Sequence, residues 1–425
     1  MGKLLLNGVG LSDGRRVDIL VDGNRISRII EKGDEAFGRE ASGRVIDCRG
    51  KTAIPGLVNM HTHTAMTAMR GICEDQHLKN WLDKVWAIES HLDDETIYWC
   101  TKLAILEMLR TGTTCFLDMY WRVPSAVRAS REMGIRAFHT YNFLDNFDPE
   151  TIALQQKECA ELYEMSKSWP TTAQMAVSVH SVYTVSKENL LWAKRFAREH
   201  DMIYTGHMSE TAAENYDSQA RYGMSPSRYY DSLGVLDSRT VMAHGVWLSP
   251  DEIKMLGERG ATVVHNINSN LKLSSGYEFK YNELRDAGVN VCLGTDGAAS
   301  SNNLDMREAM KTMALVQKAW RQDPTAMPIA ELLDVATVDG ARALGIDAGR
   351  IAEGALADIV LVDTRSEAFV PSFNFTGNLI FSANSSCIDT VIVDGKVVME
   401  GRRVAGEDEI LENAERLSWK LYKMI

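Results

Sequence analysis

Histidine and acidic side chains occur at the ends of apolar runs along this chain. Six of the ten histidines follow such runs, namely His61, His63, His180, His207, His244 and His265, and Asp296 ends another run. Imidazole and carboxylate groups bind divalent metal ions, and imidazole also transfers protons near neutral pH. If these groups meet at one place, they form a hydrolytic metal site in which a water molecule attacks the substrate.

His61 and His63 form an H-x-H pair at the end of an apolar run. Because side chains alternate along a β-strand, both rings point to the same side and are suited to hold one ion. His207 and Asp296 are the candidates for the remaining ligands. Three imidazoles and one carboxylate favour zinc, with iron or manganese as alternatives. Taken alone, the H-x-H pair is also explained by a strand cap or by histidines satisfied in the core.

Further residues are candidates for acid–base chemistry and for substrate contact. Glu210 lies three residues after His207, so both side chains can face one pocket where a strand ends. The ordinary alternative for Glu210 is a carboxylate at a helix start. His244 ends another apolar run, and His180 is expected to contact the substrate. Asp296 precedes a glycine, a pair that on its own indicates a turn.

Eight apolar runs alternate with amphipathic stretches through the middle of the chain. The runs span residues 53–60, 113–119, 135–141, 175–180, 202–207, 240–244, 262–266 and 289–296. The stretches include residues 93–110, 150–167, 187–198 and 251–259, and the first repeats its apolar residues at intervals of three and four. Alternating strands and helices form a parallel sheet, and eight repeats indicate a closed (β/α)8 TIM barrel. The polar candidates then share the carboxyl-terminal rim of the barrel, where this fold holds its active site.

The two ends of the chain resemble each other and differ from the middle. Short apolar runs with turn signals between them occur at residues 4–6, 17–21 and 26–30, and again at 357–362, 390–393 and 396–399. We expect both ends to pair into one small β-sandwich domain of residues 1–55 and 355–425. The barrel of residues 56–354 interrupts this domain. The last stretch, residues 407–423, is expected to be a helix.

Composition and charge exclude several classes of partner. The 425 residues carry a formal net charge of −12, whereas nucleic acids and anionic membranes require basic patches. The seven cysteines are scattered without a C-x-x-C pair, so neither a disulfide framework nor a thiolate zinc site is indicated. No segment has the pattern of a signal peptide or the length of a membrane span. A cytoplasmic protein is therefore expected.

Several segments together carry a resemblance to a known family. They are residues 55–63 (Pro-Gly-Leu-Val-Asn-Met-His-Thr-His), 69–71 (Met-Arg-Gly), 207–210 (His-Met-Ser-Glu), 268–273 (Asn-Ser-Asn-Leu-Lys-Leu), 293–300 (Leu-Gly-Thr-Asp-Gly-Ala-Ala-Ser) and 354–360 (Gly-Ala-Leu-Ala-Asp-Ile-Val). This set resembles the amidohydrolase superfamily, and within it the branch of 5′-methylthioadenosine, S-adenosylhomocysteine and 5′-deoxyadenosine deaminases. The family pattern usually has proline where Ile267 stands in this chain.

The resemblance implies one divalent ion per subunit, with Zn²⁺ favoured. The matching ligand positions are His61, His63, His207 and Asp296. Binuclear members of the family bridge two ions with a carboxylated lysine near the end of the fourth strand, and residues 175–180 contain no lysine. Superfamily relatives often form oligomers, so a homo-oligomer is expected.

The resemblance also implies roles for the residues around the ion. Glu210 and His244 match the acid–base and water-orienting residues of the family, and Asp296 is expected to carry the proton of the water to the leaving ammonia. Glu89 resembles the residue that binds the ribose hydroxyls, although alone it is equally well explained as a surface helix residue. The expected substrate contacts are Glu89, His180, Glu210, Trp86 and Ser300.

These roles predict hydrolytic deamination of an adenosine-type nucleoside to its inosine analogue. Tyr141 stands where relatives that accept S-adenosylhomocysteine often have arginine, and the loop that follows is aromatic and acidic, which disfavours a carboxylate. 5′-Deoxyadenosine, 5′-methylthioadenosine and adenosine are therefore favoured over S-adenosylhomocysteine. One alternative is a deaminase or chlorohydrolase that acts on a free base or a triazine. An alternative of another class is a non-catalytic nucleoside-binding barrel.

Overall fold

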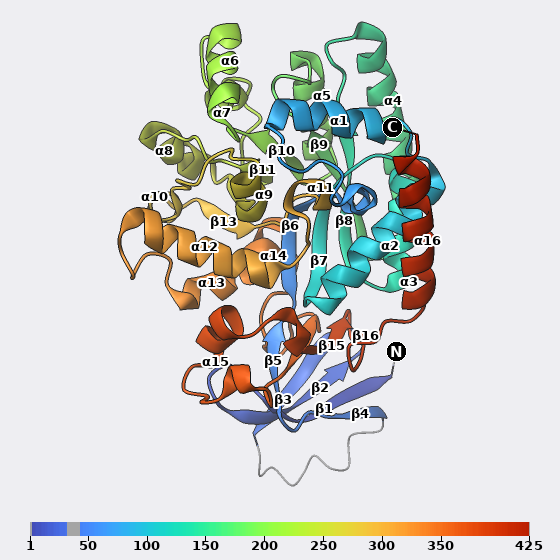
Figure 1. Cartoon of the computed structure of the whole chain (residues 1–425), viewed down its shortest axis with the longest axis vertical. Helices are drawn as coiled ribbons and strands as arrows, with labels where there is room; N and C mark the ends of the chain where they lie inside the picture. The colour runs from blue at the N-terminus through green and yellow to red at the C-terminus, as the bar shows by residue number, and fades with distance from the viewer. Residues whose placement is uncertain (1, 32–42, 425) are drawn as a thin grey trace.

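The centre of the molecule is a ring of eight parallel strands (Figure 1). The computed structural model describes residues 2–31 and 43–424. The strands are β6 (Leu57–Thr62), β7 (Thr113–Met119), β8 (Arg136–Phe143), β9 (Ala173–Val179), β10 (Tyr204–Met208), β11 (Thr240–His244), β12 (Thr262–His265) and β13 (Asn290–Leu293). Each pairs with the next in sequence, and the Asp296 N–H donates to the His61 carbonyl at 2.9 Å, which links the last segment to the first. The predicted (β/α)8 barrel is confirmed.

Helices connect the strands around the outside of the barrel. They are η2 (Thr64–Met69), α1 (Leu78–Glu89), α2 (Asp94–Arg110), α3 (Val123–Met133), α4 (Pro149–Ser166), α5 (Lys187–Glu199), α6 (Ala212–Tyr222), α7 (Pro226–Ser232), α8 (Pro250–Arg259), α9 (Ile267–Lys272), α10 (Tyr281–Asp286), α11 (Ala298–Ser301), α12 (Met306–Arg321), α13 (Ile329–Val335) and α14 (Val338–Leu344). Local capping fixes several starts, because Asp93 and Asp148 accept backbone N–H groups of the first turn and Ser249 forms a capping box. In Figure 1, α1 crosses above the strands at the end opposite the small sheet.

A buried cluster fills the interior of the barrel below its rim. Its members are Val58, Met60, Cys115, Leu117, Phe138, Ala176, Ile203, Val241, Val264, Cys292, Ala343 and Leu344. The register of β6 on β7 shifts between Asn59 and Thr62, as a β-bulge would cause. This shift explains how Met60 packs in the interior cluster while its neighbour His61, together with His63, faces the polar site at the rim.

The two ends of the chain form one mixed sheet next to the barrel (Figure 1). Its strands are β1 (Lys3–Gly10), β2 (Arg16–Asp22), β3 (Arg25–Glu31), β4 (Gly43–Asp47), β5 (Lys51–Pro55), β14 (Ile359–Asp363), β15 (Ile388–Val393) and β16 (Lys396–Met399). The central pairing joins β5 from one end of the chain to β14 from the other, antiparallel. The expected small β domain built from both ends is therefore present, and its eight strands belong to a single hydrogen-bonded sheet.

The prediction of one strand at residues 53–60 is wrong, because the structure has two strands there. β5 ends at Pro55 in the small sheet and β6 begins at Leu57 in the barrel. Gly56 joins them at a place with no room for a side chain, since a Cβ there would lie 2.0 Å from Thr114 Oγ1. The apolar run is continuous in the sequence because both strands are buried, so hydrophobicity alone could not locate the break.

Five helical segments of the described chain lie beyond α14, in addition to β14, β15 and β16. The short helical turns η3 (Glu367–Phe369), α15 (Phe375–Gly377), η4 (Asn378–Ser382) and η5 (Ser385–Cys387) lie between β14 and β15. The expected last helix is α16 (Glu407–Tyr422), and it lies against α2 of the barrel (Figure 1). We propose that the chain divides into a small domain of residues 1–55 and 355–425 and a barrel of residues 56–354. In this division, α16 belongs to the small domain and extends along the barrel.

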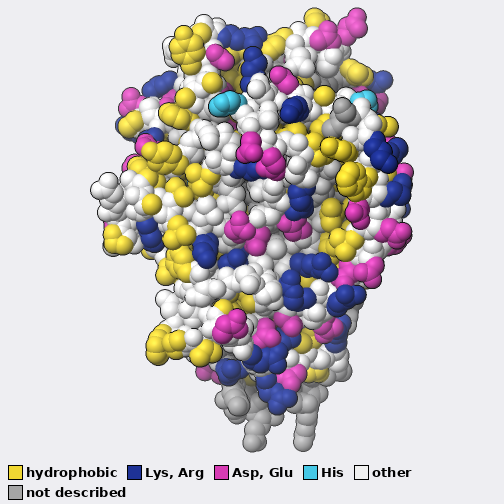
Figure 2. Space-filling view, in the orientation of Figure 1, with side chains coloured by type: hydrophobic (Ala, Val, Ile, Leu, Met, Phe, Trp, Pro, Cys, Tyr) yellow, Lys and Arg dark blue, Asp and Glu magenta, His cyan; other side chains and the backbone are white. Residues whose placement is uncertain are grey.

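The described surface carries both signs of charge. Figure 2 shows Asp and Glu side chains scattered among Lys and Arg over one face of the molecule. None of the described helices combines the length and the apolar character that a membrane span needs.

Candidate active site

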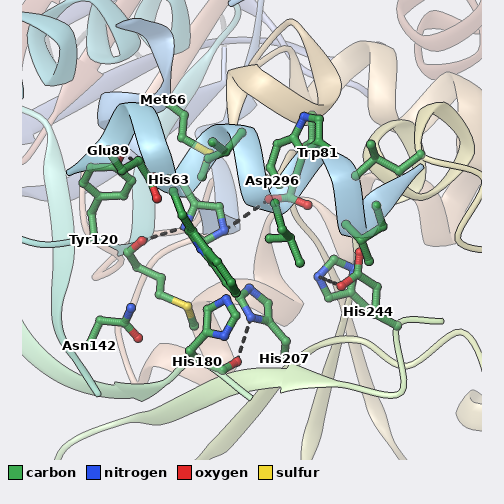
Figure 3. Close-up of a pocket in the computed structure, with 18 of the residues that line it drawn as sticks. His63, Met66, Trp81, Glu89, Tyr120, Asn142, His180, His207, His244 and Asp296 are labelled. Atoms are coloured by element: carbon green, nitrogen blue, oxygen red, sulfur yellow. Dashed lines mark hydrogen bonds and ion pairs between the residues drawn. The ribbon is translucent and has the colours of Figure 1, made fainter. Parts of the chain in front are cut away.

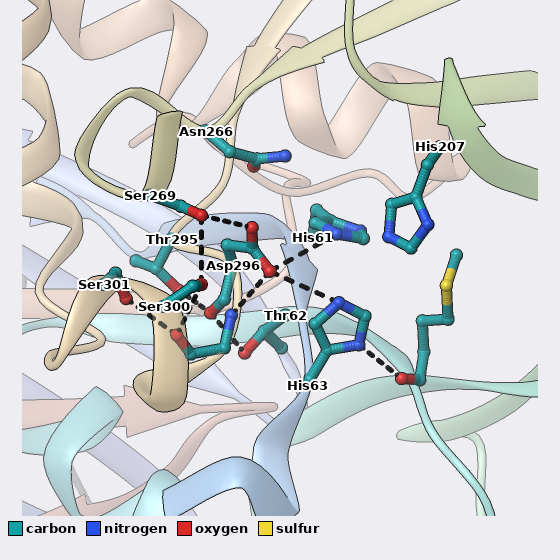
Figure 4. Close-up of polar contacts among 12 residues, drawn as sticks. His61, Thr62, His63, His207, Asn266, Ser269, Thr295, Asp296, Ser300 and Ser301 are labelled. Atoms are coloured by element: carbon teal, nitrogen blue, oxygen red, sulfur yellow. Dashed lines mark hydrogen bonds and ion pairs between the residues drawn. The ribbon is translucent and has the colours of Figure 1, made fainter. Parts of the chain in front are cut away.

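Four potential metal ligands meet at the carboxyl-terminal rim of the barrel (Figure 4). His61 and His63 come from the end of β6, His207 from β10, and Asp296 from the turn between β13 and α11. Asp296 Oδ1 lies 3.3 Å from His63 Nε2 and 3.8 Å from His61 Nε2. The His207 ring centroid lies 5.0 Å from that of His61 and 5.6 Å from that of His63. The predicted strand 289–296 ends earlier, at Leu293, so Asp296 is placed by a turn.

In His63 and His207, a hydrogen bond at Nδ1 lets the other ring nitrogen, Nε2, face the site. His63 Nδ1–H donates to the Met119 carbonyl at 2.6 Å, and His207 Nδ1–H donates to the His180 carbonyl at 2.7 Å. Such bonds orient metal-binding histidines. His61 Nε2 is buried and has no hydrogen-bond partner among the described residues. An unpaired nitrogen of this kind is costly unless it binds something.

The spacing of these atoms fits a divalent ion. Zinc–nitrogen bonds are about 2.0–2.1 Å long, so two ligand atoms on one tetrahedral ion lie about 3.4 Å apart. Burial lowers the pKa of His63, but the hydrogen bond and the charge of Asp296, with smaller contributions from the Met119 carbonyl and Asp118, together outweigh burial and raise that pKa to about 9. Burial likewise raises the pKa of Asp296, but the hydrogen bond from His63 and the charges of His63, His61 and His244 together reverse this and hold that pKa well below its usual range. The proton shared by this pair is the one that a bound cation would replace.

Glu210 and His244 lie beside the four donors. Glu210 follows β10, and its Oε2 is 3.9 Å from Nε2 of His244, which ends β11. Burial and, next, the charge of Asp296 raise the pKa of Glu210 to about 8, so this carboxyl keeps its proton at neutral pH. Burial lowers the pKa of His244. The pair therefore consists of a neutral acid and a neutral imidazole.

The backbone at these strand ends is strained. Ser209, His244 and Asp296 have φ angles of 50°, 76° and 63°, a left-handed conformation that non-glycine residues rarely adopt. Backbone strain of this kind clusters at functional sites, where surrounding contacts hold it. One such contact is the Glu210 N–H, which donates to Glu214 Oε2 at 2.7 Å.

A cavity of about 580 Å³ opens onto these residues (Figure 3). This volume includes space that is open to solvent at the mouth of the cavity. The described residues that line it include the predicted substrate contacts Trp86, Glu89, His180, Glu210 and Ser300. No lysine or arginine is among the described lining residues. The lining therefore combines aromatic and aliphatic side chains with carboxyl, imidazole, amide and hydroxyl groups.

Glu89 is the last residue of α1 and reaches the cavity from above (Figure 3). Its Oε1 accepts the hydroxyl proton of Tyr120 at 2.7 Å, while Oε2 is buried and has no partner among the described residues. Burial raises the pKa of Glu89 to about 7. The free oxygen is available to a hydroxyl group of a ligand.

Two other predicted substrate contacts, His180 and Ser300, are held by neighbouring side chains. His180 follows β9 directly, its Nδ1 bonds Thr184 Oγ1 at 2.7 Å, and its ring lies edge-on to Trp86 with centroids 5.9 Å apart. Ser300 Oγ lies 3.0 Å from Ser269 Oγ and belongs to the chain of polar contacts that reaches Asp296 (Figure 4). His265, whose role was left open, stacks on Phe279 at 3.9 Å and is not among the residues that line the cavity.

Several residues of the site were not predicted. Tyr120 and Asn142 line the cavity at the ends of β7 and β8, so the strand-end rule that selected the histidines also applies to them. Ser269 and Asn270 belong to a segment quoted for the resemblance, but no role followed from their types alone.

Tyr141 faces a groove beside the cavity. Its hydroxyl donates to Glu158 Oε2 at 2.7 Å, and Arg122 lines the same groove. The Arg122 guanidinium lies 3.3 Å from Asp94 Oδ1. The positive charge of Arg122 thus already has a carboxylate partner.

The chain is similar to known proteins over almost its whole length. The family model described as "Amidohydrolase family" matches residues 52–398. The chain is 42% identical to 5′-deoxyadenosine deaminase of Methanospirillum hungatei over 96% of this chain and 92% of that protein. It is 40% identical to 5-methylthioadenosine/S-adenosylhomocysteine deaminase 1 of Archaeoglobus fulgidus over 98% of this chain and 97% of that protein. A solved structure of an adenosine deaminase from Xanthomonas campestris with bound zinc superposes with a TM-score of 0.93, at 31% identity over 99% of this chain and 98% of that one.

Proposed function

Because the chain belongs to the amidohydrolase family, we propose that it removes the amino group of an adenosine-type nucleoside by hydrolysis. The observation that carries the proposal is one cavity lined by His63, His207, Asp296, the protonated Glu210 and His244, with the fourth donor, His61, next to them. The names of the similar proteins support the same activity. The products are ammonia and the inosine analogue.

The proposed cofactor is one divalent ion per subunit, Zn²⁺ by preference and Fe²⁺ or Mn²⁺ as substitutes. His61, His63, His207 and Asp296 are the proposed ligands, a donor set that suits zinc. When bound, the ion supplies the Lewis acidity that makes water nucleophilic near neutral pH. The absence of lysine from residues 175–180 supports one ion rather than two.

The residues of the chain then move the protons. Asp296 accepts the proton of the attacking water, and His244 donates a hydrogen bond to the attacking oxygen. Glu210 protonates a ring nitrogen of the purine as negative charge builds there, which its raised pKa permits. Asp296 finally passes its proton to the departing ammonia, and the remaining proton of the attacking oxygen returns to Glu210 as the carbonyl of the product forms.

The remaining lining residues hold the nucleoside. Glu89 accepts hydrogen bonds from the ribose hydroxyls through its unpaired oxygen, and Trp86, His180 and Ser300 border the base and sugar. The lack of a cation among the described lining residues supports a neutral 5′ substituent. We therefore rank 5′-deoxyadenosine, 5′-methylthioadenosine and adenosine above S-adenosylhomocysteine.

A substrate panel tests this proposal. The protein is stripped with a chelator, reloaded with zinc or manganese, and assayed for ammonia release with adenosine, 5′-deoxyadenosine, 5′-methylthioadenosine, S-adenosylhomocysteine, adenine, guanine, cytosine and a chlorotriazine. We expect turnover of the neutral adenosines well above that of S-adenosylhomocysteine, and none by the stripped protein. Turnover of free bases or triazines alone would replace the substrate assignment, and a metal-loaded protein that only binds nucleosides would make it a binding barrel.

We also propose a cytoplasmic homo-oligomer. All seven cysteines are free, which suits a reducing compartment. Leu411, Trp419 and Tyr422 are large apolar residues that remain exposed along one face of α16, which supports a contact with a second copy. Light scattering of the purified protein measures its mass in solution, and a value of 47.4 kDa, that of one chain, would contradict the oligomer.

A further inference from the structure

The short helix α9 lies next to two of the residues that handle protons. The Ser269 hydroxyl donates to Asp296 Oδ2 at 2.7 Å (Figure 4), and the Asn270 amide Nδ2 lies 3.0 Å from His244 Nδ1. Both α9 side chains are fully buried. The helix therefore holds Asp296 and His244 from behind, on the side away from the cavity.

The contact with Asn270 bears on where His244 carries its proton. A neutral imidazole has one N–H and one bare nitrogen. As the Asn270 amide is oriented in this structure, its Nδ2–H can donate to Nδ1 only when that nitrogen is bare, which favours the ring proton on Nε2. Asn266 also presents its Nδ2 toward the same atom, at 3.5 Å. Two amide groups thus favour the same tautomer.

The tautomer decides between two possible metal sites. Ligand atoms of His61, His207 and His244 lie within 4.8 Å of one another, as do those of His61, His63 and Asp296. A ring nitrogen that bears a proton has no lone pair for an ion. With its proton on Nε2, 3.9 Å from Glu210 Oε2, His244 is a hydrogen-bond donor toward the cavity and not a ligand.

We propose that Asn270 is a positioning residue that fixes the Nε2–H tautomer of His244 and so keeps His244 out of the metal site. The catalytic part of this inference rests on the proposed deaminase function, in which His244 donates to the attacking oxygen. The structural part concerns only the position of one proton and the number of bound ions.

Two variants of Asn270 and one control test the catalytic part. Asn270→Asp offers only acceptors, so it draws the proton to Nδ1 and leaves Nε2 bare. We expect kcat for 5′-deoxyadenosine to fall about 100-fold or more with KM nearly unchanged, because the wrong tautomer of a catalytic histidine is more harmful than a missing contact. Asn270→Ala removes the contact and is expected to lower kcat about 10-fold. Asn268→Asp makes the same chemical change at a half-buried position of the same helix and should behave like the wild type.

Two measurements do not depend on turnover. In zinc-loaded protein with ¹⁵N-labelled histidine, the His244 ring, assigned with His244→Gln, should show a protonated Nε2 and a bare Nδ1, and Asn270→Asp should reverse them. Metal analysis should find the same zinc content per chain in His244→Ala as in the wild type. A proton on Nδ1 in the wild type, loss of zinc from His244→Ala, or wild-type kcat in Asn270→Asp would overturn the inference. A wild type that deaminates no nucleoside would defeat the proposed function but leave both measurements decisive.

Discussion

Glu210 is the residue whose surroundings most constrain the chemistry. It is almost fully buried, near Asp296 and the His244 ring, and its one side-chain donor among the described residues is Ser275 Oγ at 3.4 Å. Burial removes the water that would stabilise its charge, so the neutral form persists to a pKa of about 8. A carboxyl that stays protonated at neutral pH can donate a proton where an ordinary glutamate cannot.

This predicts the pH dependence of turnover. A proton donor with a pKa of about 8 is fully protonated at pH 6 and is lost as the pH rises through 8, so kcat should fall on the alkaline side with a midpoint near that value. The measurement is kcat for 5′-deoxyadenosine across pH 6 to about 10 with saturating metal. A kcat that keeps rising through this range would exclude Glu210 as the donor.

Replacement of Glu210 tests the same role directly. Glu210→Gln keeps the shape but removes the transferable proton, and we expect kcat to fall at least about 100-fold with zinc content unchanged. Glu258→Gln on the exposed face of α8 is the matched control and should retain full activity. Full activity in Glu210→Gln would show that another group protonates the ring.

At the scale of elements, two glycines in the turn after β13 bring Asp296 to β6. A Cβ on Gly294 would lie 2.5 Å from Asn266 Oδ1 and 2.9 Å from the backbone nitrogen of His61. A Cβ on Gly297 would lie 2.4 Å from Met66 Sδ, near the end of a flexible side chain. The first clash involves backbone that cannot yield, whereas rotation of Met66 relieves the worst part of the second and leaves a tight contact of 3.1 Å with His63 Cβ.

The two substitutions are therefore expected to differ. Gly294→Ala should lower the free energy of unfolding by about 2 kcal/mol through overpacking and, because it displaces His61, weaken zinc binding about 10-fold. Gly297→Ala should cost less than about 1 kcal/mol. Chemical denaturation and zinc titration measure both quantities. Equal effects of the two variants would mean that the turn adapts as a whole.

The elements also show what the sequence could and could not predict. His61, His207 and His244 could be placed because a parallel barrel brings all strand ends to one rim, whatever the details of packing. The register shift in β6 and the contact of Asn270 with His244 could not be predicted from the sequence, because both depend on how separate segments pack. The break at Gly56 was hidden for a similar reason, since the strands on both sides of it are buried.

At the scale of the whole molecule, a buried ion pair joins the barrel to the small sheet. Arg136 at the start of β8 donates to both carboxylate oxygens of Asp358, at 2.9 and 3.2 Å, and to Asp394 Oδ1 at 3.2 Å. All three residues are buried. The partners are more than 200 residues apart in the chain, so the sequence gives no local sign of this contact.

Removal of one partner from this cluster should loosen the attachment of the sheet. Asp358→Asn leaves the buried guanidinium short of negative charge, and we expect a loss of about 3 kcal/mol in the free energy of unfolding. Asp363→Asn, at the end of the strand that begins directly after Asp358, is paired with Arg365 near the surface and should change stability little. Urea denaturation compares the two variants, while zinc content and kcat at 25 °C should match the wild type in both. Because the rim lies at the opposite end of the barrel from the sheet, a loss of zinc from Asp358→Asn would show that the sheet supports the active site as well as the fold.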